Sequence, residues 1–464
     1  MSNGKTLRRG SVFGALLLIG LGGLFLYANL QPEFNLWPLL AKYWPLLIIF
    51  WGLAKLADYF LLRGTPEAAA TRLGGGTIVG LIFLILIGWC FTQIVEHGWW
   101  TGPGIVIGDG ELGCLFASEY EFTDELVEPL TAPATLRLSN ARGALEITAG
   151  PGEELHVLAR KKVCAPNEGE ASRLADAFQP ILEETAEGYE FRWEAEGIDS
   201  RAIRADLTIQ VPPGVSLRLS SRRGDVAVSG IEGDLALDLN RGDAVLERIQ
   251  GNVSVELHRG SVLLAEVTGD ARVEGRGEDV TFRDIRGTAT LEGAYHGALQ
   301  FIRIGGPARF KSRRTEFSVP RVDGEVIFVS DEILVRGIPG DLRVKTRSKE
   351  IELEEVAGRV EVENRSGPVV LRFRTPPTQD IAVETRSGDI ELYLPEASAF
   401  QITARARDGE IESDFRGPGL SLQRQGDDAL LNGTYGATPP ASIRLSTTYG
   451  TIYLRYTLPG ATSD

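Results

Sequence analysis

The sequence predicts an all-β solenoid with coils of about 18 residues, preceded by an α-helical transmembrane module. Three observations support this fold class. Two uncharged runs of 23 residues lie near the N-terminus, and each is long enough to cross a hydrocarbon layer about 30 Å thick. Beyond residue 200, glycine recurs at a constant interval, at Gly233, Gly251, Gly269 and Gly287. Between these glycines apolar and polar residues alternate, which is the period of a β-strand.

Residues 1–96 are expected to form three membrane-spanning helices, at about 11–30, 38–62 and 74–95. The first and third contain the uncharged runs, and no small-residue cleavage site follows the first, so it predicts a retained anchor. The middle segment is free of charge only from Tyr43 to Ala54. A re-entrant hairpin in place of a second span is therefore the alternative.

Charge favours three spans. Lys5, Arg8 and Arg9 precede the first segment, and Arg63 and Arg72 lie between the second and the third. Three spans place both basic groups in the cytoplasm, as the positive-inside bias requires. This predicts a multi-pass protein of the cytoplasmic (inner) membrane, with a cytoplasmic N-terminus and an extracytoplasmic C-terminal domain.

The remainder of the chain is expected to divide into three parts. Residues 97–130 are expected to be a linker. Residues 131–212 are expected to form an N-terminal β region, in which ATLRLSNARGALEITAG gives two strands around a turn and EASRLADAFQPILEE gives a short capping helix. Residues 213–464 are expected to form the solenoid repeat domain, with roughly 13 coils between about 215 and 458 and with GTIYLRYTLPGATSD as the second cap.

The register of the repeat predicts apolar columns along the stack, because a small coil can bury its apolar face only against its neighbours. Four columns are visible in the sequence. They are Leu217, Leu235, Val253, Ala271 and Ala289; Leu219, Leu237, Val255, Val273 and Leu291; Val228, Leu246, Leu264 and Phe282; and Ile231, Ile249, Val267 and Ile285.

Composition narrows the function. The net charge of −15 disfavours nucleic acid as a partner, because phosphate binding needs a basic face. Cys114 and Cys164 would pair if the domain is exported, or remain free thiols; the sequence leaves both open. The oligomeric state also stays open.

Several stretches resemble known families. SSRRGDVAVSGIEGDLALDL, VETRSGDIELYLP and RARDGEIESDF are similar to the bacterial β-strand-repeat family labelled "putative adhesin", a domain of unknown function, over about residues 120–460. FGALLLIGLGGLFL and YWPLLIIFWGLAKL resemble the transmembrane region of Lia-type cell-wall-stress proteins, over about residues 8–95. The resemblance implies an envelope protein linked to adhesion, surface integrity or stress sensing, and it supplies no catalytic residues.

One basic column is the candidate contact site. Arg223, Arg241 and Arg259 share a column, with Arg276 one residue out of register. Stacked like charges repel unless something neutralises them, and an anionic polymer would do so. The alternative is mutual neutralisation with an acidic column three residues earlier, Asp238, Glu256, Glu274 and Glu292. Later coils also keep an arginine nearby, at Arg313, Arg347, Arg365, Arg386 and Arg407.

Other functions find weaker support. RGD occurs at Arg223–Asp225 and Arg241–Asp243, but glycine followed by aspartate also has a backbone role in turns. The paired glycines of calcium-binding nonapeptides are missing, and no hydrolase, zinc-protease or phosphate-loop motif occurs. We therefore expect no catalytic residues, no cofactor and no metal.

The sequence thus predicts a non-enzymatic, membrane-anchored envelope protein whose solenoid contacts an anionic envelope polymer or another membrane protein. A self-assembling envelope scaffold is the first alternative, because solenoids can stack end to end. A polysaccharide-active enzyme is the second.

Overall fold

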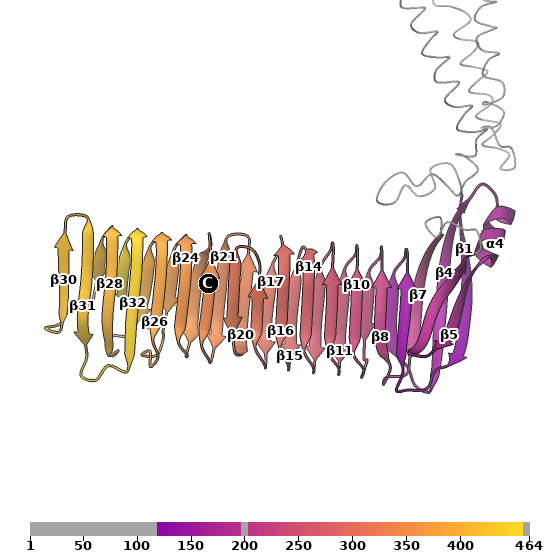
Figure 1. The fold of residues 1–464 in the computed structure, drawn as a ribbon, viewed down its shortest axis with the longest axis horizontal. Helices are drawn as coiled ribbons and strands as arrows, with labels where there is room; N and C mark the ends of the chain where they lie inside the picture. Colours follow the sequence, from indigo (N-terminus) through magenta and orange to yellow (C-terminus); the bar gives the residue numbers. More distant parts are fainter. Residues whose placement is uncertain (1–117, 196–202, 458–464) are drawn as a thin grey trace, which may run out of the picture. The chain divides into compact units, whose positions relative to one another are not determined.

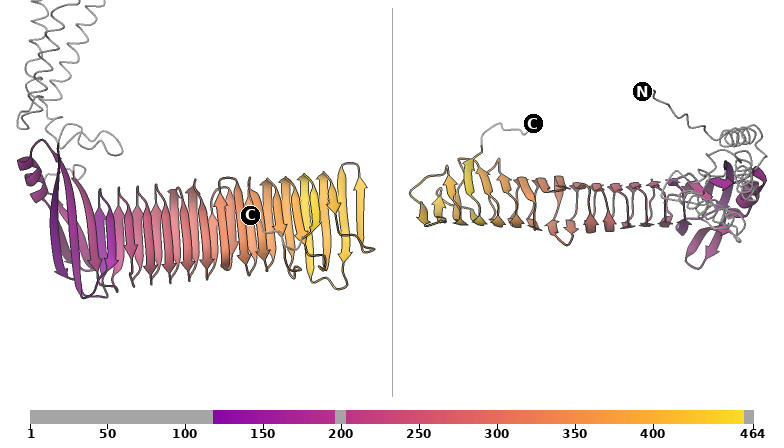
Figure 2. Two further views of the ribbon diagram at one scale, coloured as in Figure 1. Left: turned by 180° about the vertical axis from the view of Figure 1, so that it is seen from behind. Right: turned by 90° about the horizontal axis from the view of Figure 1, so that it is seen from above.

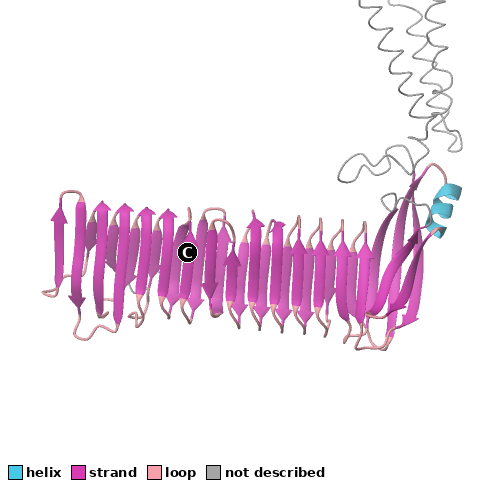
Figure 3. Cartoon of the chain, viewed as in Figure 1, coloured by secondary structure: helices cyan, strands magenta, loops and turns pink. Residues whose placement is uncertain are grey.

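In the computed structural model the described residues are 118–195 and 203–457, and they are almost all strands, with one helix among them (Figure 3). The chain divides into two compact units, Met1–Glu119 with Cys164–Asn167, and Tyr120–Val163 with Glu168–Asp464. In the second unit the strands stack into two facing sheets (Figures 1 and 2). We call the sheet that contains Ala244–Ile249 sheet A and the sheet that contains Leu235–Leu239 sheet B. The all-β part of the predicted fold class is confirmed.

Each repeat unit contributes one strand to each sheet. In sheet B, β10 (Leu235–Leu239) pairs in parallel with β12 (Val253–Leu257), so that Leu235 lies opposite Val253. In sheet A, β11 (Ala244–Ile249) pairs in parallel with β13 (Val262–Val267) at the same offset along the chain. The predicted register is therefore confirmed here. The same pairing joins β9 (Val226–Ser229), β15 (Val280–Ile285) and β17 (Leu299–Ile304) to sheet A, and β8 (Ser216–Ser221), β14 (Ala271–Gly277), β16 (Ala289–Tyr295) and β18 (Ala308–Lys311) to sheet B.

The four predicted apolar columns face the space between the sheets. Their side chains are at most 3% exposed, and they belong to one continuous core. Full burial of an aliphatic side chain contributes roughly 1.5–3 kcal/mol, and here each side chain is covered by the equivalent residue of the coils on either side. Phe282 and Phe301 continue this order as stacked rings 5.1 Å apart.

The parallel run is interrupted in both sheets between residues 299 and 346. In sheet A, β20 (Val322–Val329) lies antiparallel between β17 and β21 (Glu332–Ile338). In sheet B, β19 (Thr315–Val319) lies antiparallel between β18 and β22 (Leu342–Thr346). The stack is therefore not one uninterrupted run of parallel coils. The sequence conceals the reversal because two antiparallel steps restore the strand direction, and the glycine spacing stays close to that of the uniform coils.

The last described strands lie inside the stack and do not cap it. In sheet B, β32 (Ala441–Tyr449) pairs in parallel with β26 (Ile381–Ser387) on one side and β28 (Phe400–Asp408) on the other. In sheet A, β33 (Ile452–Tyr456) lies between β27 (Ile390–Leu394) and β29 (Ile411–Ser413). The prediction that GTIYLRYTLPGATSD closes the stack is wrong, because its apolar alternation suits an internal coil equally well.

The remaining C-terminal strands complete both sheets. Beyond β28, sheet B ends with β31 (Asp428–Tyr435) and β30 (Leu420–Gln425), which are antiparallel. The coils between the reversal and the insertion are built from β23 (Glu350–Val356) and β25 (Val369–Arg372) in sheet A and β24 (Val360–Ser366) in sheet B.

The N-terminal end is built from the segment that was predicted to cap it. The two expected strands are β2 (Thr135–Asn140) and β3 (Leu145–Ala149), which pair with β8 and β9. The expected helix is α4 (Glu168–Asp176), at this end of the stack (Figure 1); it is shorter than its sequence pattern because Phe178 begins a strand. The other strands here are β4 (Glu154–Ala165), β5 (Phe178–Thr185), β6 (Gly188–Ala195) and β7 (Ile203–Val211).

Part of the predicted linker is a strand. Residues Ser118–Pro129, expected to be linker, form β1 beside β4 in sheet A. The alternation of Tyr120, Phe122 and Leu126 is interrupted by Asp124 on the same face, which hides the strand pattern. The charge of Asp124 has a partner, described next.

A buried lysine joins β1, β4 and α4. Lys161 of β4 is 1% exposed, and its ammonium group forms an ion pair with Asp124. It also donates hydrogen bonds to the carbonyl oxygens of Ala175 (2.6 Å) and Phe178 (2.9 Å). The Ala175 carbonyl lies in the last turn of α4, where the helix leaves acceptors unsatisfied, and the Phe178 carbonyl lies at the start of β5. The ammonium group thus fixes the capping helix to the sheet.

The predicted transmembrane helices, at about 11–30, 38–62 and 74–95, lie outside the described residues. Within residues 118–195 and 203–457, no helix is long and apolar enough to cross a membrane. Cys164 is disulfide-bonded, and the other two cysteines, Cys90 and Cys114, also lie outside the described residues.

The buried pair makes a prediction about stability. We expect Asp124→Leu to lower the free energy of unfolding by about 3 kcal/mol, because it leaves a buried ammonium group without its counter-ion. The double variant Asp124→Leu with Lys161→Met removes both charges and should regain most of that loss. Chemical unfolding of the detergent-solubilised chain, followed by circular dichroism, measures both. A double variant as unstable as the single one would show that the charges are not the cause.

Candidate basic edge of sheet B

The turns that follow the sheet B strands require glycine. Gly242 has φ +139°, and a Cβ atom there would lie 2.2 Å from the carbonyl oxygen of Gly224 in the preceding coil. Gly224 and Gly260 occupy the same place in their own coils, with φ of +137° and +124°. Only glycine fits this close approach. This accounts for the glycine in the repeated RGD and RGS phrases.

The aspartate of the same phrase has a backbone role. The Asp225 carboxylate accepts a hydrogen bond from the N–H of Asp243 (3.0 Å), and the Asp243 carboxylate accepts one from Ser261 (2.8 Å). The turns at the opposite edge use the same contact, since the Asp234 carboxylate accepts a hydrogen bond from the N–H of Asn252 (2.8 Å). Each carboxylate therefore caps the next coil, as short polar side chains do in turns. The RGD phrases are explained by this turn geometry.

The predicted arginine column is present and extends further than predicted. Gly224 donates a backbone hydrogen bond to Arg241 (3.0 Å), and Gly242 donates one to Arg259 (3.2 Å), so that Arg223, Arg241 and Arg259 follow one another along the edge. Arg142 precedes them, because Gly143 donates to the Arg223 carbonyl (2.9 Å). Sequence reasoning missed Arg142 because it lies far from Arg223 along the chain, outside the regular repeat. Only the local likeness of NARGALEI to SRRGDVAV could have indicated it.

The electrostatics of Arg142 reflect this column. Burial lowers the pKa of Arg142, and the positive charges of Arg223 and Arg204 lower it further. The strands that hold these arginines stand about 4.8 Å apart. The column therefore keeps like charges close together.

Arg276 belongs to a neighbouring column, as predicted. Gly275 lies opposite Leu257 and Arg276 lies opposite Ala294, which places Arg276 in the row of His258, one residue before Arg259. The predicted acidic column is also present on sheet B, from Asp238 through Glu256, Glu274 and Glu292. Its partner in part of the stack is Arg272, which forms ion pairs with both Glu274 and Glu292 (3.6 Å to the latter).

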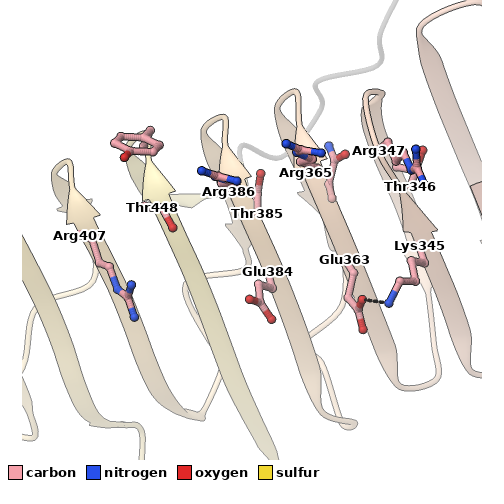
Figure 4. Close-up of a pocket in the computed structure, with 12 residues that line it drawn as sticks. Lys345, Thr346, Arg347, Glu363, Arg365, Glu384, Thr385, Arg386, Arg407 and Thr448 are labelled. Carbon is pink, nitrogen blue, oxygen red and sulfur yellow. Dashed lines mark hydrogen bonds and ion pairs between the residues drawn. The ribbon is translucent and has the colours of Figure 1, made fainter. Parts of the chain in front are cut away.

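A groove lies along the same edge in the C-terminal half, with a volume of about 590 Å³ (Figure 4). Thr346, Asn364 and Thr385 are register partners on β22, β24 and β26. The residues that directly follow them, Arg347, Arg365 and Arg386, therefore form a row, and all three are exposed. Figure 4 shows these arginines side by side at the turn ends of their strands.

The inserted strand β32 interrupts this row. Thr385 and Ala406 both pair with Thr447, so Thr448 occupies the position between Arg386 and Arg407. Tyr449 follows it and is 51% exposed. We name Arg347, Arg365, Arg386 and Arg407 the arginine row. Sequence spacing could not order it, because the strand between Arg386 and Arg407 comes from residues 441–449.

The arginine row has no acidic partner among the residues that the structure describes. Glu363 lines the groove but its carboxylate forms an ion pair with Lys345. Five basic and two acidic side chains line the groove, which gives a net formal charge of +3 on a chain whose net charge is −15. The edge is therefore suited to an anionic ligand.

A buried polar row lies beneath the arginines. Thr346, Asn364, Thr385 and Thr447 are at most 5% exposed. The Asn364 amide donates to the carbonyl oxygens of Lys349 (2.7 Å) and Gly367 (3.2 Å), and the Thr447 hydroxyl donates to Gly388 (3.1 Å). The Thr385 hydroxyl and the Asn364 side-chain oxygen have no hydrogen-bond partner in the described part of the chain. Across the described ranges, no cluster of three or more His, Cys, Asp or Glu side chains could hold a metal ion.

Comparison with known proteins confirms both resemblances over shorter stretches than expected. Residues 339–455 match the Toastrack DUF4097 family model, and residues 12–56 match the LiaI-LiaF-like transmembrane region. The first match contains the whole arginine row. The second implies association with a membrane. The chain thus combines a Toastrack-type β region with a Lia-like membrane region. No curated protein matches.

Two solved structures are similar to the chain at 10% identity. A putative cell adhesion protein from Clostridium sporogenes aligns over 72% of this chain and 100% of its own, with a TM-score of 0.18. A putative adhesin from Bacteroides fragilis aligns over 73% of this chain and 98% of its own, with a TM-score of 0.21.

The turn glycine makes a prediction about stability. We expect Gly242→Ala to lower the free energy of unfolding by roughly 3 kcal/mol, because the methyl group would collide with the Gly224 carbonyl. Gly152 is the matched control: its φ is also strongly positive (+102°), but no atom lies within 4 Å of a Cβ there. Gly152→Ala should cost less, roughly 1–2 kcal/mol, because it adds backbone strain without a collision. Equal losses in chemical unfolding would show that backbone strain alone matters.

The capping carboxylate makes a second prediction. Asp243→Ala should lower the free energy of unfolding by about 1 kcal/mol, because the N–H of Ser261 loses its acceptor. Asp243→Asn should retain most of the stability, since Asn252 accepts the equivalent bond from Asp270 (2.9 Å). The same unfolding measurement compares them. An asparagine variant as unstable as the alanine variant would contradict the capping role.

Proposed function

We propose that this protein is a non-enzymatic, membrane-anchored cell-envelope protein whose extracytoplasmic β domain contacts anionic envelope polymers along the basic edge of sheet B. The observation that carries the proposal is the arginine row, in which three exposed guanidinium groups on adjacent strands lack an acidic partner within the described residues. Adhesion or the sensing of envelope stress would follow from such contact.

Electrostatics support a polymeric ligand. Two unit charges about 4.8 Å apart repel by about 1 kcal/mol even in water-like surroundings. A row along successive strands repeats that cost. A small anion would relieve one contact, whereas a chain with regularly placed negative charges relieves all of them together. The predicted residues Arg223, Arg241, Arg259 and Arg276 extend the basic edge towards the N-terminal half.

The domain arrangement supports an exported position. We propose three membrane spans in residues 1–96, a cytoplasmic N-terminus, and a β-solenoid that faces away from the cytoplasm. The positive-inside bias and the match of residues 12–56 to a transmembrane region support this topology. The disulfide at Cys164 also supports it, because disulfides persist mainly in oxidising compartments.

One observation favours a self-assembling scaffold as a second function. Sheet B ends at β30, whose outer edge pairs with no other strand among the described residues. Its sequence, LSLQRQ, has no proline, and Leu422 on it is 45% exposed. Exposed edge strands of this kind can pair with another chain. Concentration-dependent filaments of the detergent-solubilised chain would support the scaffold.

A binding assay tests the main proposal. Full-length protein in detergent micelles is incubated with isolated cell-wall sacculi at low and at high salt concentration, and the bound fraction is pelleted. We expect binding at low salt and at least about tenfold weaker binding at high salt, since exposed charges are screened. The triple variant Arg347→Ala, Arg365→Ala, Arg386→Ala should lose binding, and the triple variant Arg223→Ala, Arg241→Ala, Arg259→Ala should weaken it.

Arg309→Ala is the matched control. Arg309 is exposed on β18 but does not line the groove, so this variant should bind as the wild type does. Folded wild-type protein that binds at neither salt concentration would refute polymer contact. Binding that is unchanged in both triple variants would place the contact elsewhere on the molecule.

A further inference from the structure

We propose that the groove of the arginine row binds a linear acidic polysaccharide, with its anionic groups on Arg347, Arg365, Arg386 and Arg407 and one sugar ring stacked on Tyr449. This inference rests on the proposed function and deepens it by naming the ligand class. The polymer would run along the stack, across the strands, because the row itself runs in that direction (Figure 4).

Charge selects an anionic ligand at any pH above the pKa of the ligand's acidic groups. The guanidinium group stays protonated throughout the physiological range and can bind a carboxylate or phosphate through two parallel hydrogen bonds. Within the described residues, no ion pair occupies the four guanidinium groups of the row, and the groove carries a net formal charge of +3. The one other acidic side chain lining it, Glu384, is exposed.

Spacing favours a charge on each sugar residue. Successive strands of the row stand about 4.8 Å apart, which is close to the length of one pyranose residue in an extended glycan. Arg347, Arg365 and Arg386 therefore present one guanidinium group for each sugar of a polyuronate-like chain. At the fourth position Thr448 offers a hydroxyl in place of a charge, and Arg407 follows.

Tyr449 distinguishes a glycan from a simple polyanion. It is 51% exposed, and it is the one aromatic residue among the large exposed hydrophobic side chains of the described chain. Register places it between Ser387 and Asp408, next to the arginine row. A tyrosine ring offers a flat apolar face with a polar edge. The C–H face of a sugar ring packs on such a surface, whereas an inorganic polyanion gains nothing from it.

Titration of the full-length protein in detergent micelles with defined probes tests the inference. The probes are a fluorescein-labelled oligogalacturonate of about ten sugars, the same oligomer with its carboxylates methyl-esterified, and inorganic polyphosphate. The variants are Tyr449→Ala, the triple variant Arg347→Ala, Arg365→Ala, Arg386→Ala, and the control Arg309→Ala. Circular dichroism confirms that each is folded.

We expect the acidic oligomer to bind at least about tenfold more tightly than its ester, and the triple variant to lose at least about tenfold in affinity. Tyr449→Ala should weaken the acidic oligomer by about fivefold and leave polyphosphate unchanged, and Arg309→Ala should change neither.

Three results would overturn the inference. Equal binding of the ester and the acid would remove the role of the arginine row. If Tyr449→Ala bound the acidic oligomer as tightly as the wild type does, and polyphosphate also bound tightly, the groove would be a polyanion site that recognises charge alone. The proposed function would still stand. Binding of none of the three probes would refute the inference, and if sacculi did not bind either, it would refute the proposed function as well.

Discussion

The fixed distance between neighbouring coils is the constraint on which the rest of the structure depends. Backbone hydrogen bonds set it, and Gly224, Gly242 and Gly260 allow it, because any side chain there would strike the carbonyl of the preceding coil. Once the distance is fixed, every residue lies against its own equivalent in the next coil. Columns of apolar residues then form a continuous core. Columns of charged residues bring like charges close together, and their repulsion must be offset by other groups.

The stack tolerates repeated charge in two ways. Aspartates of the turns accept backbone N–H groups, so that Asp225 and Asp243 are stabilised by the coil that follows each. In a second column, residues of opposite charge stand in neighbouring coils. Arg303 donates two hydrogen bonds to the Asp284 carboxylate (2.6 and 2.7 Å), and this contact holds the pKa of Asp284 below its usual value. The arginine row follows neither pattern. That departure, on an acidic chain, is the basis on which we propose an external anion as its partner.

The periodic sequence predicted the features that recur in every coil. It could not predict the features that depend on which strands pair across long distances in the chain. The columns of Leu237 and Leu246 could be predicted because equal spacing leaves one register that buries them. Arg248, Glu266 and Asp284 have φ of 55° to 58°, and no sequence pattern showed this left-handed backbone position, since charged residues there look like ordinary surface. The reversal at β19 and β20 and the insertion of β32 escaped prediction because exchanging similar coils leaves the apolar alternation intact. The arginines of the groove could be picked out in the sequence. Their order along the groove could not, because it depends on the insertion of β32.

The insertion of β32 and β33 has a consequence for how the chain matures. Residues 400–413 lie beyond residues 441–456 in the stack, although they emerge earlier during synthesis. The strand pair β28 and β29 must therefore wait, unpaired with β26 and β27, until the final coil arrives. Such distant contacts form slowly because a long loop must close first. If the domain is exported, the C-terminal half becomes native only after almost the whole chain has crossed, so a truncated chain would present an incomplete groove.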